Sequence, residues 1–144
     1  MHLIRRTARA ALVGLSTLAL ATACSDTTGT TQLQGRYDLQ SVNNEPLPIV
    51  TFESSSEREE IIDGWVELDA SGRFSDAVVF RTTVVGFPAQ QTTDEVTGDY
   101  EVNGDEVVFF PDDGSAEYSM IRSGGTLRQS INVSGQTYTF RYSK

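Results

Sequence analysis

The sequence is poor in the side chains that most enzymes use for acid–base and thiol chemistry. Its 144 residues contain one histidine, His2, and one cysteine, Cys24. A lone cysteine excludes an intramolecular disulfide. His2 lies in an N-terminal segment that is expected to be removed, so the mature chain can build neither a Ser–His–Asp nor a Cys–His arrangement and lacks the usual nitrogen and sulfur ligands of zinc. No glycine-rich phosphate loop is present. We therefore expect no enzyme, no cofactor and no metal site.

Basic residues and long apolar runs are also scarce. Eleven lysines and arginines face twenty acidic residues, which gives a formal net charge of −9. That balance argues against nucleic-acid binding, which needs a basic surface. No apolar run reaches the roughly 20 residues of a membrane-spanning helix. The 38% apolar content nevertheless exceeds that of a fully disordered chain, and the length suits one domain.

Residues 1–23 have the order of a secretory signal peptide. Arg5, Arg6 and Arg9 are followed by an uncharged, mostly apolar stretch, Ala10–Ala23, which is too short to span a bilayer. Its removal would take away three basic residues and no acidic one, leaving a net charge of −12. His2 would leave with it, so the mature chain would contain no histidine.

The segment Leu20–Cys24 resembles the lipobox of bacterial lipoproteins, in which a small residue precedes the lipidated cysteine. The resemblance implies that Cys24 carries acyl chains such as palmitate and holds the protein at the cell envelope. Ser25 then suggests sorting to the outer membrane, if the cell has one. The alternative is a free thiol beside an ordinary cleavage site. Residues 24–34 would form a polar, flexible tether, and residues 35–144 the folded domain.

From Gly35 onward, apolar and polar residues alternate as they do in half-buried strands. Val96, Gly98, Tyr100 and Val102 alternate with acidic and polar residues, and Asn103-Gly104 predicts a type I′ hairpin turn. The same alternation recurs to the C-terminus. In the most ambiguous part, we expect Ile49–Glu53 to be a strand and the acidic stretch after it, up to Ile62, to be a loop. The pattern predicts about eight or nine antiparallel strands in a meander that closes into a small barrel.

Short motifs of the domain resemble those of small bacterial lipocalin-like lipoproteins. They are Gly35-Arg36-Tyr37 with Leu47-Pro48, Gly64–Leu68, Gly98–Tyr100, and a final strand with aromatics, Tyr138–Arg141. The resemblance implies a lipocalin-like barrel that binds a small apolar ligand. In lipocalins a late arginine packs across an N-terminal aromatic, here Arg141 and Tyr37. Strand parity, however, places Arg141 opposite Tyr138 and Phe140, which argues against that pairing.

Aromatic residues at inward positions are the candidate ligand contacts. They could line a cavity, or they could simply fill the barrel, because a barrel of eight strands has little spare interior. Trp65 lies on the polar face by parity, where it would be an exposed partner contact or would pack under Glu45–Pro48. The candidate ligand-binding residues are Tyr37, Phe74, Tyr100, Tyr118, Tyr138 and Phe140.

Clustered carboxylates offer weaker candidates. Asp99 with Glu101, or Asp94 with Glu95, has the side-chain type of a glycosidase pair. Asp112–Ser115 with Glu117 could supply oxygen ligands to calcium, although it lacks EF-hand spacing. We expect the pairs to be a solvated strand face and the second group to be a hairpin tip.

Two functions follow from these features. The first is an envelope-anchored, lipocalin-like module that binds a small apolar ligand. The second is an interaction protein with a filled barrel, whose acidic surface binds a cationic protein partner, as a lysozyme inhibitor would.

Overall fold

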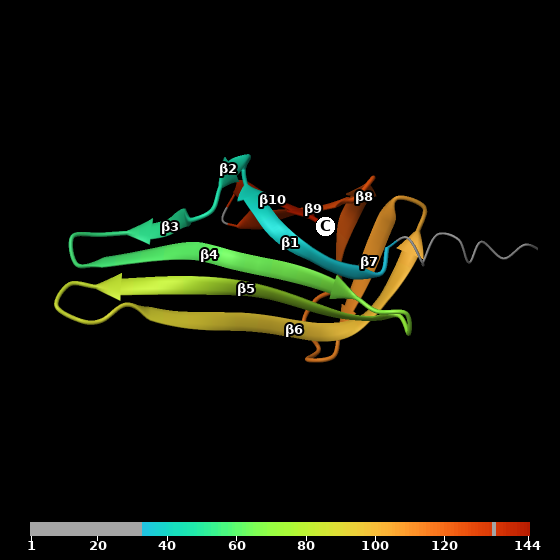
Figure 1. The fold of residues 1–144 in the computed structure, drawn as a ribbon, viewed down its shortest axis with the longest axis horizontal. Helices are drawn as coiled ribbons and strands as arrows, with labels where there is room; N and C mark the ends of the chain where they lie inside the picture. The colour runs from blue at the N-terminus through green and yellow to red at the C-terminus, as the bar shows by residue number, and fades with distance from the viewer. Residues whose placement is uncertain (1–32, 134) are drawn as a thin grey trace, which may run out of the picture.

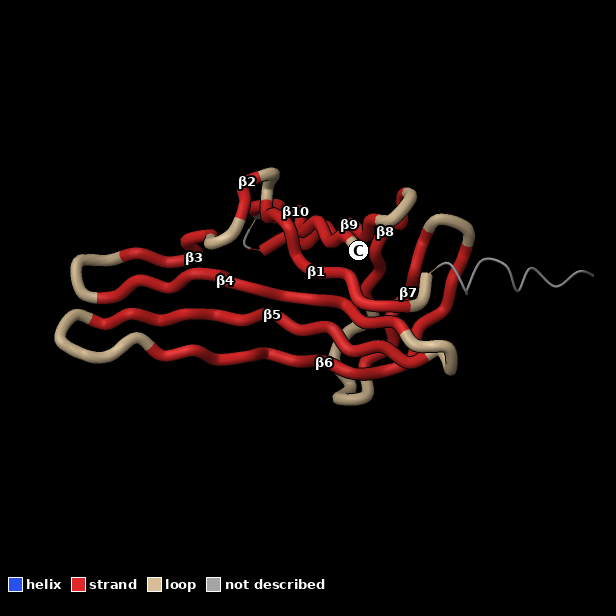
Figure 2. The backbone as a smooth tube through the Cα atoms, viewed as in Figure 1, coloured by secondary structure: helices blue, strands red, loops and turns tan. Residues whose placement is uncertain are grey.

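The computed structural model describes residues 33–133 and 135–144, and none of them is helical (Figure 2). Cys24 and the predicted signal peptide lie outside the described residues. The strands are β1 (Gly35–Val42), β2 (Glu45–Pro46), β3 (Ile49–Glu53), β4 (Glu57–Leu68), β5 (Arg73–Val84), β6 (Gln90–Asn103), β7 (Glu106–Pro111), β8 (Tyr118–Ser123), β9 (Thr126–Val133) and β10 (Gln136–Ser143). The predicted all-β class is confirmed.

The antiparallel sheet closes on itself into a barrel. Its strand order is β2-β1-β10-β9-β8-β7-β6-β5-β4-β3, and β1 also pairs with β4, from Gly35 opposite Leu68 to Asp38 opposite Trp65. Eight strands therefore form the barrel, and β2 and β3 lie outside the closed ring. Closure leaves the eight paired strands without a free edge along the paired stretch, as the meander pattern predicted.

Strands β4, β5 and β6 continue beyond the closed part of the barrel. Within β6, only Gly98–Asn103 pairs with β7, and within β4, only Trp65–Leu68 pairs with β1. The remaining parts of β4, β5 and β6, flanked by β3, form an open sheet that projects to the left in Figure 1. We call this part the extension: β3 with residues 57–61, 80–84 and 90–95.

Aromatic rings fill the centre of the barrel. The Phe74 ring meets the Phe109 ring edge-on at 4.9 Å, and the Phe109 ring stacks on Tyr118 at 4.9 Å. Val107, Met120 and Leu127 are fully buried beside them. Burying such side chains supplies most of the driving force for folding a domain of this size.

Two local predictions are corrected. Asn103 is not in the turn: it pairs with Glu106 at the end of the ladder, and Gly104 has φ +65°. The type I′ dihedrals occur instead at Asn43 and Asn44, with φ of 54° and 68°, between β1 and β2. Asparagine tolerates this left-handed region better than other residues with side chains.

The acidic stretch that was predicted to be a loop becomes strand from Glu57 onward. The Glu60 carboxylate, whose side chain is only 8% exposed, accepts hydrogen bonds from Arg58 and Arg81. These two guanidinium groups hold the pKa of Glu60 below its ordinary value. Cross-strand charge pairing therefore stabilises a strand that composition alone does not suggest.

Candidate functional site

Partly exposed apolar side chains ring the end of the barrel from which the extension leaves. They face inward and pack on the core, yet none of them is fully buried. We call this group the barrel mouth: Val78, Phe80, Val96, Tyr118, Ile131 and Tyr138. The β9–β10 turn places Ile131 and Tyr138 opposite each other in the ladder, and β5 supplies Val78 and Phe80.

A carboxyl group lies among these apolar residues. Asp76 occupies an inward position of β5, between Val66 of β4 and Val96 of β6 in the ladder. The Tyr118 hydroxyl donates a hydrogen bond to Asp76 Oδ2 at 2.8 Å. Burial raises the pKa of Asp76 from 3.8 to about 6 because the apolar surroundings disfavour the charged form. Burial and the nearby Asp76 charge also raise the pKa values of Tyr118 and Tyr142.

One oxygen of Asp76 is open to a further donor. Within residues 33–133 and 135–144, Oδ2 accepts from Tyr118 and no hydrogen bond to Oδ1 is formed. Asp76 is partly accessible to solvent, so this oxygen is not an orphaned buried atom. A carboxyl group in this position can accept a hydrogen bond from a small molecule whose apolar part contacts the barrel mouth.

The predicted aromatic residues are distributed along the whole barrel. Tyr118 and Tyr138 belong to the barrel mouth, and the Phe74 ring lies 6.1 Å from the Tyr118 ring. Phe140 is buried in the core. Tyr37 and Tyr100 use their hydroxyls on the backbone, donating to the carbonyl oxygens of Leu33 at 2.9 Å and Asp69 at 2.8 Å. The structure therefore does not bring all six together.

A basic residue does cover the N-terminal aromatic, but it is not Arg141. Arg141 is exposed, as parity indicated, and the ammonium group of Lys144 lies 4.9 Å from the Tyr37 ring centroid. On the outer face, the guanidinium of Arg36 lies 4.4 Å from the ring of half-buried Trp65. Both are cation–π contacts, which stabilise by about 0.5–1 kcal/mol at exposed sites.

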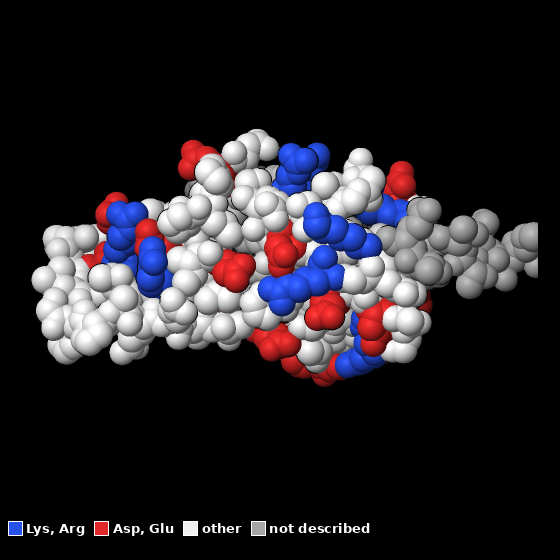
Figure 3. Space-filling model, viewed as in Figure 1, with Lys and Arg blue, Asp and Glu red and all other residues white. Residues whose placement is uncertain are grey.

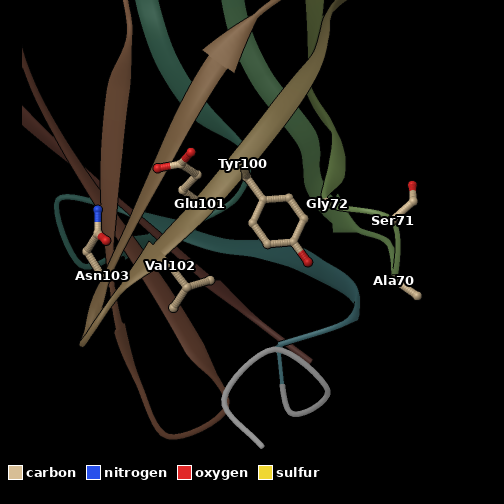
Figure 4. Close-up of a pocket in the computed structure, with 7 residues that line it drawn as sticks. All are labelled: Ala70, Ser71, Gly72, Tyr100, Glu101, Val102 and Asn103. Carbon is tan, nitrogen blue, oxygen red and sulfur yellow. The ribbon is translucent and has the colours of Figure 1, made fainter. Parts of the chain in front are cut away.

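A surface hollow lies near the β4–β5 turn and has a volume of about 440 Å³. Figure 4 shows the Tyr100 ring directed toward the turn, whereas Glu101 points away from it. Because the Tyr100 hydroxyl is already bound to Asp69, the hollow offers few converging polar groups. Its lining residues are Ala70, Ser71, Gly72, Tyr100, Glu101, Val102 and Asn103.

The predicted carboxylate clusters lie on the surface. Arg73 bonds both Asp99 and Asp112, and Glu95 accepts from the Ser75 hydroxyl at 2.8 Å. Asp113 Oδ1 accepts from the Ser115 amide at 2.9 Å, which is the geometry of a hairpin tip. In the described part of the chain, no three potential ligand residues gather into a metal site. Figure 3 shows basic and acidic side chains interleaved across one face.

Asp76 is the site residue that the sequence reasoning missed. Phe74, Asp76 and Val78 alternate with Ser75 and Ala77, so parity alone could have marked an acidic residue at an inward position. The described residues include no helix long and apolar enough to cross a membrane. No known protein family matches the chain, and no curated protein matches it.

Proposed function

We propose that the protein is a lipocalin-like binding module that holds a small, mostly apolar molecule at the barrel mouth, with a hydrogen-bond donor of that molecule on Asp76. The observation that carries this proposal is the largely buried but still partly accessible carboxyl of Asp76 among inward apolar side chains. A ligand site of this kind combines apolar walls with a few placed polar groups.

The packing of the barrel limits where such a molecule would bind. Tyr37, Val107, Phe109, Met120 and Leu127 are at most 1% exposed, so they occupy the interior with side chains. The ligand would therefore lie above this packed layer, against the inner face of the extension. A short apolar molecule or one chain of an amphiphile suits this shallow position better than a large ring system.

A blocking substitution tests the proposal. We expect Ile131→Trp to fill the barrel mouth and weaken binding of a neutral fluorescent apolar probe, N-phenyl-1-naphthylamine, at least tenfold. The matched control is Ile121→Trp, because Ile121 is 52% exposed on the outside of β8. Titration of the probe fluorescence measures both affinities, and circular dichroism checks that both variants keep their β-structure.

Equal probe affinities for the two variants would contradict binding at the barrel mouth. Native mass spectrometry of protein extracted from its host provides a second readout, because a bound molecule adds a discrete mass. We expect this adduct on the parent chain and on Ile121→Trp, and its loss from Ile131→Trp.

We also propose that the domain is anchored to a bacterial membrane, and specifically the outer membrane, through acylated Cys24. The support is the order of charge, apolar run, small residues and cysteine in residues 1–24. Each acyl methylene that enters the bilayer contributes about 0.8 kcal/mol, so several chains hold a protein stably.

Anchoring predicts a simple result for Cys24→Ser. We expect cells fed labelled palmitate to incorporate it into the parent chain and into a Ser25→Ala control, but not into Cys24→Ser. Immunoprecipitation followed by detection of the label measures this. Labelled Cys24→Ser protein, or an unlabelled parent chain, would refute lipidation at this position.

A cationic protein partner is the second candidate function, and its support is the net charge of −12 expected for the mature chain. The described arginines Arg36, Arg58, Arg73 and Arg81 each bond a carboxylate of the same chain. These ion pairs are already counted in the net charge and leave it unchanged, so an excess of carboxylates remains for a cationic partner.

A further inference from the structure

Among residues 33–133 and 135–144, no strand lies beside the outer edge of β6 in the extension. β7 pairs with β6 only from Gly98 onward, and the last backbone bond on that side runs from the Asp112 amide to the Thr97 carbonyl at 2.9 Å. Residues 90–95 are all exposed. Figure 1 shows this part of β6 along the lower border of the extension, with β5 on one side only.

The hydrogen-bonding direction of each residue on this edge follows from its neighbours. Thr97 bonds toward β7, whereas Tyr100 donates to Gly72 on the β5 side at 2.8 Å. Because backbone direction alternates along an antiparallel strand, odd-numbered residues of β6 point away from β5. The amide and carbonyl groups of Gln91, Thr93 and Glu95 therefore face the open side.

The two edges of the extension differ in their protection against pairing. β3 is short, follows Pro46 and Pro48, and carries an irregularity between Val50 and Phe52. Such features discourage a further strand from pairing. The β6 edge has no proline between Gln90 and Val96, and its pairing with β5 runs there without a register shift. It is straight enough to accept a strand over its full length.

We infer that this edge pairs with the same edge of a second copy of the chain, antiparallel and centred on Thr93. Only residues whose backbone groups point away from β5 can exchange hydrogen bonds with the second copy. This register pairs Thr93 with Thr93 at the centre and places Gln91 opposite Glu95 of the other copy. It places Thr92 opposite Asp94 of the other copy. Each carboxylate thus meets a side chain that donates a hydrogen bond.

Other two-fold registers are poorer. Centring on Asp94 or on Glu95 places identical carboxylates directly opposite each other, which is destabilising. Centring on Thr92 avoids that repulsion but leaves Glu95 and Val96 without opposite residues in β6. The Thr93 register alone uses the whole free segment from Gln90 to Val96 and sets every charge against a donor.

Cysteine substitutions in the full chain test both pairing and register. Directly opposite residues in a hydrogen-bonded pair have Cα atoms about 5.5 Å apart, within the range that a disulfide spans. We expect Thr93→Cys to give a disulfide-linked dimer in membranes treated with copper–phenanthroline. Gln91→Cys alone should give at least tenfold less disulfide-linked dimer, because the two copies of position 91 are about 14 Å apart in this register.

Gln91→Cys produced together with Glu95→Cys should restore the dimer, since these positions are opposite each other. The parent chain, which retains Cys24, gives the background. Adding Thr93→Pro to both of those chains should remove the cross-link, because proline deletes an amide that points away from β5. All these positions are exposed, so the cysteine variants keep the fold.

Three outcomes would overturn the inference. One is the absence of a Thr93→Cys dimer. Another is equal cross-linking at positions 91 and 93, which indicates random collision. The third is a cross-link from position 93 to a different protein, which indicates that an extended segment of another partner occupies the edge.

Discussion

Replacing Gly98 with alanine is expected to destabilise the fold more than any other single-methyl addition to the barrel. A Cβ atom at Gly98 would overlap the carbonyl oxygen of Phe110 and lie 2.7 Å from Cε1 of Phe74. The first obstacle is backbone of the neighbouring strand, which cannot rotate away. Overpacking a core costs about 1–3 kcal/mol, and we expect at least the upper end here.

Thermal unfolding followed by circular dichroism measures this effect. A loss of about 3 kcal/mol lowers the melting temperature of a domain of this size by roughly 10–20 °C. The matched control is Gly125→Ala in the β8–β9 turn, where a Cβ atom meets nothing within 4 Å and φ is not positive. A Gly98→Ala melting temperature within a few degrees of the control would show that β6 and β7 separate readily at this point.

Gly98 also shows what alternation can and cannot predict. The sequence places Gly98 on the inward face, between Val96 and Tyr100, and the structure buries it there. The requirement for glycine comes from the Phe110 carbonyl on the adjacent strand. That requirement depends on how closely two strands approach, which a one-dimensional pattern does not contain.

Turn and strand boundaries depend on similar cross-strand information. Asn103-Gly104 has the composition of a type I′ turn, but the ladder with β7 continues through Asn103 and shifts the loop by one residue. Likewise, the acidic run before Ile61 has little strand propensity of its own. It extends because Arg81, far along the sequence, pairs with Glu60.

The candidate site was predictable in its apolar part and not in its polar part. Tyr118 and Tyr138 were expected to face inward from the period of two, and both belong to the barrel mouth. Asp76 was overlooked because a carboxylate in a strand is normally assigned to a solvated face. Its inward position is explained by the Tyr118 hydroxyl on the facing wall of the barrel, which supplies a donor at 2.8 Å.

Asp76→Asn is expected to make the domain more stable at pH 8 and to change its pH dependence. The asparagine carbonyl can still accept the Tyr118 hydrogen bond, while the buried charge disappears. Because the pKa of Asp76 is about 6 in the folded state against an ordinary 3.8, the folded parent binds a proton more tightly than its unfolded chain does. The contribution of the Asp76 carboxyl to the free energy of unfolding is therefore most favourable below about pH 4, and it is lost as the pH rises through about 6.

The size of the effect follows from the difference between the two pKa values. Each unit corresponds to about 1.4 kcal/mol, so ionised Asp76 lowers the free energy of unfolding by about 2–3 kcal/mol above pH 6. Urea unfolding at pH 4 and at pH 8 measures it. We expect the free energy of unfolding of Asp76→Asn to exceed that of the parent by about this amount at pH 8 and by much less at pH 4.

Asp94→Asn is the control for net charge. Asp94 is exposed on β6, so this substitution removes the same charge from a solvated position. If Asp94→Asn raises the free energy of unfolding at pH 8 as much as Asp76→Asn does, repulsion among the acidic residues of the whole domain, rather than burial of Asp76, is responsible. A specific gain at Asp76 would mean that the parent chain tolerates a destabilising carboxyl at the barrel mouth.

Residues that reduce stability are typical of binding sites, so the same variant should also weaken binding of an apolar ligand that donates a hydrogen bond. N-phenyl-1-naphthylamine carries one N–H donor, so Asp76→Asn should also weaken its binding, but less than Ile131→Trp does. Blocking the mouth removes apolar contact, whereas Asp76→Asn removes the charge and replaces one acceptor oxygen with an NH2 group.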